Sequence, residues 1–555
     1  MQVRRIAVVV LVLAGVVWPA ASGVATNPAT TQAAAAGSLQ ADFNNDGFAD
    51  LAVTVPYEDV GAIPDAGAVH VLYGAPTGLG AAGGQLLTQD SPGVPGVAEV
   101  GDVFGSALAT GDFDDDGFAD LAVGVDGESL GGGATTAGAV NVLYGTAGGL
   151  TGVGSQVFTQ DSPGVPGVAE LGDVFGVALA TGDFDGDGFD DLVVGVPGED
   201  LGGVEFGGAV NVLGGAGGGL TGSGSQLFTQ DSPGVGDSAE GFDGFGEALA
   251  TGDFDDDGFD DLAVGVNRED LGSLSEAGAV NVLPGTSGGL TGIGSLLLTQ
   301  DSPGVGSIAE VLDVFGYAVA AGDFNRDGFA DLAVGAAFED VGAVQAAGAV
   351  NVLPGAPGGL TGIGSQLLTQ NSPGVPGSAE LDDVFGYALA TGDFDNNGFT
   401  DLAVGVPGEN LGAVEAGAAN VLLAAGGGLT GAGGQLLSQD SPGVPGVAEE
   451  DFFAEGLTAA DFDDDGFDDL AVGVPGEDVG AVMEAGAANV VYGAAGGLTA
   501  TGSQLFTQDT PGMPDTAEGD DLFALGLAAS GPQRATAPPA SPPSRSSPRP
   551  APADR

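Results

Sequence analysis

The sequence predicts an all-β protein, a seven-bladed β-propeller with a calcium-binding loop in every blade. Three observations lead to this fold class. A motif with the pattern Asp-Phe-x-x-(Asp/Asn)-Gly-Phe-x-Asp-Leu recurs seven times, with starts that lie 68 to 71 residues apart. Each period holds four short apolar runs bounded by Gly, Pro and Asp, and none has helical spacing. The motif gathers oxygen ligands around a glycine turn. Its copies are the acidic loops 42–50, 112–120, 183–191, 253–261, 323–331, 393–401 and 461–469.

The N-terminal residues 1–25 have the composition of a secretory signal peptide. Arg4 and Arg5 precede an apolar stretch over residues 6–17, and small residues follow it. About 12 apolar residues are too few to span a bilayer, and a short buried helix is the alternative interpretation. We therefore expect a secreted protein without membrane insertion, in which an Ala- and Thr-rich spacer over 26–37 leads to the propeller.

One copy of the repeat shows why a blade is predicted. Strand-like runs cover 173–180, 192–196, 208–213 and 225–229, with turn residues between them. Four strands per period, repeated seven times, describe the blades of a propeller. A linear β-solenoid is the competing architecture, but its repeats are usually shorter, about 20 to 30 residues.

The two ends of the repeat array predict that the ring closes. The segment before the first acidic loop lacks the strand that precedes most of the other loops, and residues 520–529 supply a strand of that type after the last one. We expect this closing strand to complete the first blade and to remove the free sheet edges. The propeller then covers 38–531. Residues 532–555 turn to Pro, Ser, Ala and Arg, which indicates a disordered tail or, equally, a slip of reading frame.

The acidic loops have the ligand pattern of a calcium site. Carboxylates or amides at loop positions 1, 3, 5 and 9 and the backbone carbonyl at position 7 supply hard oxygen ligands, and Gly at position 6 permits the sharp turn. A solvated β-turn is the alternative for any single loop. Position 12 is Val in all seven copies, which excludes the EF-hand. The predicted ligands are Asp42, Asn44, Asp46, Phe48 and Asp50; Asp112, Asp114, Asp116, Phe118 and Asp120; Asp183, Asp185, Asp187, Phe189 and Asp191; Asp253, Asp255, Asp257, Phe259 and Asp261; Asp323, Asn325, Asp327, Phe329 and Asp331; Asp393, Asp395, Asn397, Phe399 and Asp401; and Asp461, Asp463, Asp465, Phe467 and Asp469.

The charge balance fits bound cations and excludes some partners. The formal net charge is −69, with 77 acidic residues against eight Lys and Arg. Such an anionic chain repels phosphate backbones, so we expect no nucleic-acid partner. Up to seven calcium ions are expected, and the three loops with an Asn ligand should bind them more weakly because an amide brings no charge.

The sequence offers little for catalysis, and no catalytic residue is predicted. Cys and Lys are absent, and the one histidine, His70, stands where neighbouring copies have Asn141 and Asn211, so a structural role is expected for it. Arg268 and Arg326 are isolated cations in an acidic field and should form local ion pairs.

The chain resembles the FG-GAP repeats of integrin alpha-chain propellers and their bacterial relatives. The Phe-Gly pairs that carry the resemblance are Phe104-Gly105, Phe175-Gly176, Phe245-Gly246, Phe315-Gly316 and Phe385-Gly386, and Gly-Ala-Pro occurs at 74–76 and 355–357. The last two copies have Phe453-Ala454 and Phe523-Ala524 instead. The resemblance implies calcium loops on one face of a seven-bladed ring and partner binding on the other face.

Together these features favour a non-enzymatic protein-binding or cell-adhesion module, a monomeric ring whose partner is an extracellular protein or a cell-surface ligand. Repeated loops suit weak multivalent contacts. Two alternatives remain open at this stage: the propeller of a secreted hydrolase, phospholipase D-like or glycan-active, and a purely structural spacer.

Overall fold

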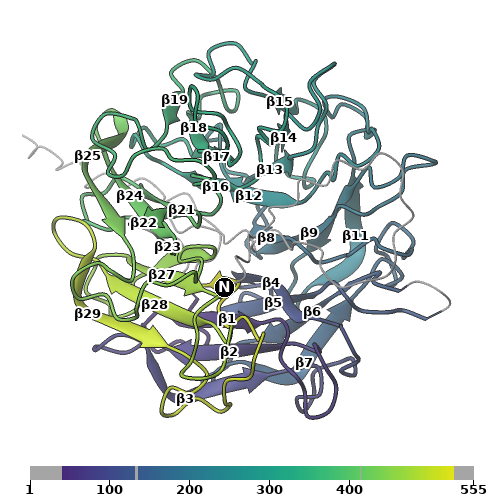
Figure 1. Cartoon of the computed structure of the whole chain (residues 1–555). Helices are drawn as coiled ribbons and strands as arrows, with labels where there is room; N and C mark the ends of the chain where they lie inside the picture. The colour runs from purple at the N-terminus through teal and green to yellow at the C-terminus, as the bar shows by residue number, and fades with distance from the viewer. Residues whose placement is uncertain (1–40, 132–134, 413, 530–555) are drawn as a thin grey trace, which may run out of the picture.

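A computed structural model describes residues 41–131, 135–412 and 414–529, which form a ring of seven four-stranded antiparallel sheets (Figure 1). The prediction of an all-β, seven-bladed propeller is confirmed. The innermost strands of neighbouring blades contact one another around the ring. This described part contains no helix, and therefore none that is long and apolar enough to cross a membrane. The predicted signal peptide, spacer and C-terminal tail lie outside the described residues.

Each blade is one sheet whose strands follow one another in space as in the chain, and blade 1 alone combines the two ends of the described chain. Blade 1 contains β3 (Gly80–Leu87), β2 (Ala68–Tyr73), β1 (Leu51–Val55) and β30 (Leu527–Ala528). Blades 2 to 4 contain β4 (Phe104–Gly111), β5 (Asp120–Val125), β6 (Ala139–Tyr144) and β7 (Thr151–Phe158); β8 (Leu179–Gly182), β9 (Asp191–Val196), β10 (Ala209–Gly214) and β11 (Thr221–Phe228); and β12 (Ala248–Gly252), β13 (Asp261–Val266), β14 (Ala279–Leu283) and β15 (Leu296–Leu298). Blades 5 to 7 contain β16 (Val319–Gly322), β17 (Asp331–Ala336), β18 (Ala349–Leu353) and β19 (Gln366–Leu368); β20 (Leu389–Gly392), β21 (Asp401–Val406), β24 (Ala418–Ala425) and β25 (Gly428–Leu437), with the small hairpin β22 (Asn410–Leu411) and β23 (Val414–Glu415); and β26 (Leu457–Ala460), β27 (Asp469–Val474), β28 (Ala487–Tyr492) and β29 (Thr499–Phe506).

The innermost strand of a blade is shorter than the sequence indicated. The run predicted at 173–180 forms a strand only from Leu179, and Phe175 makes a single bridge to Gly138. Val174 and Gly176 have φ values of 51° and 101°, which interrupt an extended backbone. Only β4 extends back to its Phe-Gly pair.

The chain closes the ring by strand pairing. β30 pairs antiparallel with β1, with Leu527 opposite Val53 and Ala528 opposite Ala52. The Ala41 N–H donates to the Ala529 carbonyl at 3.0 Å, which joins the two ends of the described chain. Within the segment 520–529, the strand is confined to β30. The pairing covers the edge of β1 that would otherwise be exposed at the ring's inner side.

The hydrophobic core lies between blades. Each of the seven apolar clusters combines side chains of two neighbouring sheets. Two phenylalanines per repeat are fully buried there, one at loop position 2 and one in the Phe-Gly or Phe-Ala pair: Phe43, Phe113, Phe184, Phe254, Phe324, Phe394 and Phe462, and Phe104, Phe175, Phe245, Phe315, Phe385, Phe453 and Phe523. Close approach of the blades requires small residues. A Cβ on Gly124 of β5 would lie 2.1 Å from the Gly176 carbonyl oxygen of the next blade.

A polar contact is also repeated at all seven seams between blades. A glutamine that follows the outermost strand of one blade donates from its amide to a glutamate that follows the second strand of the next blade. These pairs are Gln89–Glu128, Gln160–Glu199, Gln230–Glu269, Gln300–Glu339, Gln370–Glu409, Gln439–Glu477 and Gln508–Glu58. The last pair joins blade 7 to blade 1, so the set runs around the whole ring.

Candidate metal centre

In blades 2 to 7 an acidic loop joins the innermost strand to the second strand, and in blade 1 the loop 42–50 leads into β1, the second strand of that blade. These loops lie on one face of the ring. The carboxylate at position 1 organises the loop by accepting from the backbone N–H groups of positions 5 and 6. In the loop 112–120, Asp112 accepts from Asp116 and Gly117, both at 3.0 Å. Gly117 has φ of 87°, a left-handed conformation that glycine adopts without strain. The expected role of the position 6 glycine is therefore met in the geometry of the turn.

The carboxylate at position 9 connects the loop to the rest of its blade. Asp120 is 1% exposed, and its two oxygens accept from the backbone N–H groups of Phe113 (3.0 Å) and of Gly145 in the next hairpin (2.9 Å). The same two contacts occur in all seven loops. Buried N–H groups require partners. The recurrence of Asp at position 9 therefore has a structural cause that does not depend on an ion.

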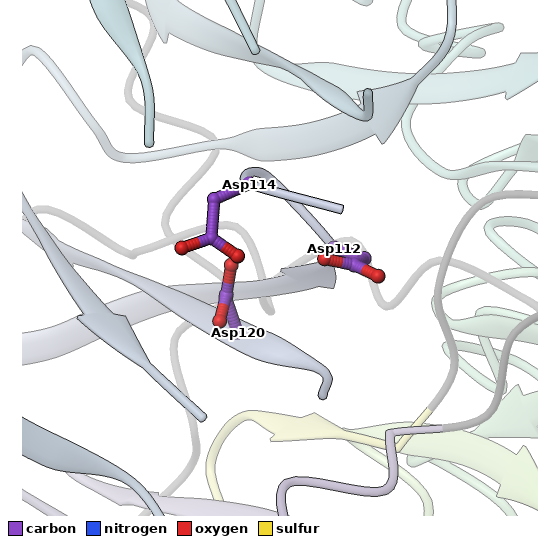
Figure 2. Close-up of side chains that lie close together, drawn as sticks. All are labelled: Asp112, Asp114 and Asp120. Atoms are coloured by element: carbon purple, nitrogen blue, oxygen red, sulfur yellow. The ribbon is translucent and has the colours of Figure 1, made fainter. Parts of the chain in front are cut away.

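Position 3 differs because its carboxylate makes only local contacts: Asp185 and Asp395 accept from the position 5 N–H of their own loops, at 3.1 and 3.2 Å. The Oδ1 atoms of Asp114, Asp255 and Asp463 are buried and make no hydrogen bond in the described structure. Figure 2 shows the Asp114 carboxylate directed toward that of Asp120, with Asp112 beside them. A buried carboxylate oxygen without a donor is unfavourable unless a cation lies next to it.

Five of the seven loops bring three carboxylates together, with ligand atoms within 4.8 Å of one another. Two combinations of loop positions occur. Positions 1, 3 and 9 converge at Asp112, Asp114 and Asp120, at Asp253, Asp255 and Asp261, and at Asp393, Asp395 and Asp401; positions 1, 3 and 5 converge at Asp183, Asp185 and Asp187, and at Asp461, Asp463 and Asp465. The oxygen-only donor set, its density and its turn geometry fit Ca²⁺.

The two remaining loops carry Asn at position 3, namely Asn44 and Asn325. The Asn325 amide nitrogen donates to both carboxylate oxygens of Asp331, at 3.2 and 3.1 Å. In this loop a neutral amide hydrogen-bonds to the position 9 carboxylate where other loops present a third carboxylate. The loop 393–401 has Asn397 at position 5 and still brings three carboxylates together. Substitution at position 3 therefore has a different consequence from substitution at position 5.

The position 5 side chain caps the turn. In every loop its oxygen accepts from the backbone N–H of the position 7 phenylalanine, for instance Phe118 to Asp116 at 3.0 Å. The predicted ligands at position 7, Phe48, Phe118, Phe189, Phe259, Phe329, Phe399 and Phe467, are thereby held in the turn through their N–H groups.

Burial and neighbouring carboxylates raise the pKa values of these groups. Desolvation is the largest cause at position 9. It raises the pKa to about 8 for Asp50, Asp120, Asp401 and Asp469, and to about 7 for Asp191, Asp261 and Asp331. Burial also raises the pKa of Asp114, and the charges of Asp116 and Asp112 add to that effect. A divalent cation would reverse these shifts, because an opposite charge favours the ionised form.

The structure also places the three basic residues of the repeat region. Arg268 forms the expected ion pair with Glu247 at 3.2 Å. Arg326 instead donates to the Asn397 carbonyl at 3.3 Å and lies over the Phe399 ring of the neighbouring loop, so a local ion pair was the wrong expectation for it. His70 is fully buried, and desolvation lowers its pKa to about 4, which keeps it neutral.

A second cluster, which the sequence analysis missed, lies around the ring's centre on the opposite face. It is built at the position that follows each Phe-Gly or Phe-Ala pair, where the otherwise similar copies differ. These residues are Ser106, Val177, Glu247, Tyr317, Tyr387, Glu455 and Leu525. The innermost strands run from this position toward the acidic loops, so the two clusters are on opposite faces of the ring. The variation among copies at this position was the feature of the sequence that could have indicated this cluster.

The central cluster, as we call this set with Tyr57, Asp126, Arg268 and Phe338, combines aromatic and acidic groups from several blades. The Tyr317 ring lies 5.1 Å from that of Tyr387 and 5.9 Å from that of Phe338. The Tyr387 hydroxyl donates to Glu455 at 3.4 Å. Desolvation raises the pKa of Glu455 to about 7. Tyr317 interacts electrostatically with Glu455 and Glu247, which belong to blades 7 and 4.

A family model described as FG-GAP repeat matches the chain seven times, at residues 36–72, 104–143, 175–213, 245–283, 315–353, 385–422 and 453–492. Each match except the first begins at the Phe of a Phe-Gly or Phe-Ala pair, and each includes an acidic loop.

Curated relatives include integrin alpha chains. Integrin alpha pat-2 of Caenorhabditis briggsae is 35% identical over 245 residues, 42% of this chain and 18% of the relative. Integrin alpha-5 of Xenopus laevis is 33% identical over 245 residues, 42% of this chain and 20% of the relative. The chain thus spans about a fifth of the length of these relatives. Among solved structures, the exotype rhamnogalacturonan lyase YesX has a TM-score of 0.35 at 13% identity, covering 89% of this chain and 68% of that chain. A score at this level says nothing about activity.

Proposed function

We propose, from the premise that this chain belongs to the FG-GAP repeat family, that it is a secreted, calcium-stabilised propeller that binds an extracellular protein or cell-surface ligand and has no enzymatic activity. The curated proteins to which the chain is similar include integrin alpha chains. In this proposal the acidic loops hold calcium on one face, and the opposite face binds the partner.

One observation carries the binding proposal: repeats that are alike elsewhere differ where they meet at the ring's centre. Seven similar blades cannot make a unique site unless some positions vary. The varied positions of the central cluster place aromatic rings next to partly buried carboxylates, and Tyr317 and Tyr387 provide the ring faces. Aromatic anchors and desolvated charged groups are the features that concentrate binding energy in protein interfaces. Carboxylates beside aromatic rings favour a cationic group on the ligand.

The experiment compares two charge-matched variants of the chain. The central variant carries Glu247→Gln and Glu455→Gln, and the control carries Glu205→Gln and Glu240→Gln, at two exposed sites. Binding to immobilised extracellular-matrix proteins and to whole cells is measured in calcium and in EDTA. We expect calcium-dependent binding that falls about tenfold, about 1.4 kcal/mol, in the central variant only. Absence of calcium-dependent binding to any of these surfaces contradicts the proposal, as does equal binding by both variants.

A further inference from the structure

A second repeated set of acidic groups lies at the seams, on the face opposite the acidic loops. A buried aspartate that precedes the Phe-Gly or Phe-Ala pair of the same blade interacts electrostatically with the glutamate of each Gln–Glu pair. These aspartates are Asp102, Asp173, Asp243, Asp313, Asp383, Asp451 and Asp521, and each is at most 4% exposed. We call the three residues at one seam a seam cluster.

The seam between blades 4 and 5 shows the geometry. The Gln300 amide donates to Oε2 of Glu339 at 2.5 Å, and Oδ2 of Asp313 accepts from the Glu310 N–H at 2.6 Å. Burial and, next, the charge of Asp313 raise the pKa of Glu339 to about 8, so these two carboxyl groups influence each other across the seam. Each carboxylate therefore uses one oxygen to hold its position and has a second oxygen in the seam.

Each seam also holds an unpartnered oxygen. The Oε1 atom of the seam glutamine is buried without a hydrogen-bond partner at all seven seams, and these side chains are at most 4% exposed. That oxygen is bonded to the same carbon as the nitrogen that contacts the glutamate. A buried amide oxygen without a donor is unfavourable, and its occurrence at every seam indicates a shared missing partner rather than a local irregularity.

The described chain supplies no cationic side chain to these carboxylates. Its only Arg residues are Arg268, paired with Glu247, and Arg326, which lies on an acidic loop. Two ionised carboxylates about 4 Å apart repel each other by about 4 kcal/mol at an effective dielectric constant of 20. The seam clusters therefore need either a cation or a proton shared between the two carboxyl groups.

We propose that the seam clusters form a second ring of divalent-cation sites, each of which takes Ca²⁺ between the Glu and Asp carboxylates and the Gln amide oxygen. These are three hard oxygen ligands with two charges, and backbone carbonyls or water complete the coordination of such ions. The orphaned amide oxygen favours the cation over the shared proton, because a proton between the carboxyl groups leaves that oxygen without a partner. A ring of such ions connects each blade to the next, including blade 7 to blade 1.

The test counts ions. Equilibrium dialysis of the whole chain at 0.15 M salt, which screens loose surface binding, gives the number of tightly held calcium ions. The acidic loops account for at most seven, so we expect more than seven. Changing the seven seam glutamates to Gln preserves shape and should reduce the count to seven or fewer. A charge-matched control changes seven exposed carboxylates to amides, among them Glu205, Glu415 and Glu450, and should leave the count unchanged.

Two results overturn the proposal. A wild-type count of seven or fewer does so directly, whether or not any variant folds. An unchanged count in the folded seam variant does so as well, and then a shared proton is the explanation for the paired carboxyl groups. If the sevenfold variant does not fold, Glu339→Gln is compared with Glu205→Gln, and loss of one bound ion is expected in the former only.

Discussion

The loops 112–120 and 323–331 have the same turn but differ in what fills it. In both, position 1 accepts from two loop N–H groups and position 9 accepts from a loop N–H group and from the next hairpin. The first loop presents Asp114 with an unpartnered oxygen, whereas in the second the Asn325 amide donates to Asp331. The hydrogen bonds of positions 1 and 9 form a scaffold that all copies need. The cation site, in contrast, depends on the residue at position 3.

The largest effect should come from the scaffold and should appear in both loops. Asp120→Ala and Asp331→Ala each leave two buried backbone N–H groups without an acceptor. A buried donor left without an acceptor costs about 1 to 3 kcal/mol, so a loss of about 2 to 6 kcal/mol in unfolding free energy is expected. Denaturant unfolding measures it, in calcium and in EDTA. If the loss appears only in calcium, position 9 serves the ion and not the scaffold.

Exchanging the position 3 residues should move the cation site from one loop to the other. Asn325→Asp should add a calcium-dependent stabilisation of about 1.4 kcal/mol when calcium exceeds its dissociation constant tenfold, and Asp114→Asn should remove one. In EDTA the changes in stability should have the opposite signs. Asn325→Asp should destabilise the chain because the new carboxylate repels Asp331, and Asp114→Asn should stabilise it because the amide relieves repulsion in its loop. Thermal unfolding of both variants, each with calcium and with EDTA, measures these four changes in stability. Equal responses to calcium in both variants would show that position 3 does not determine binding.

The pH dependence should also distinguish the two metal states. Burial raises the pKa of Asp120 to about 8, above the ordinary value of 3.8. The folded state therefore binds more protons than the unfolded state between these values, and without calcium the stability should fall as pH rises from about 4 to 8. Bound calcium favours the ionised carboxylates and should weaken or reverse this slope. Unfolding free energies at pH 5 and 8, in EDTA and in calcium, test this, and parallel slopes would contradict it.

The smallest effect concerns the turn that both loops share. Gly117 and Gly328 have φ values of 87° and 95°. A Cβ at Gly328 meets no atom within 4 Å, so Gly328→Ala introduces backbone strain alone, of about 1 kcal/mol or somewhat more. Thermal unfolding should give the same loss for Gly117→Ala. A loss confined to one loop would indicate that the two turns differ after all.

The sequence predicted what depends on local pattern and period. The seven blades, the loop boundaries and the glycine turn follow from residues that lie within a few positions of one another. The innermost strand was misplaced because the left-handed conformation of Val174 has no signature in a valine. The link from Asp120 to Gly145, 25 residues away, depends on how two hairpins pack. The central cluster was missed because only ring closure brings positions about 70 residues apart to one place.

The most direct test of the account is calorimetric melting of the purified chain with calcium and with EDTA. Five loops that each contribute about 1.4 kcal/mol give about 7 kcal/mol at tenfold saturation. For a propeller of this size that corresponds to a rise of about 7 °C in Tm. A shift of this order, lost with EDTA and restored by added calcium, is the predicted result. Identical melting in both solutions would contradict the claim that the acidic loops hold calcium.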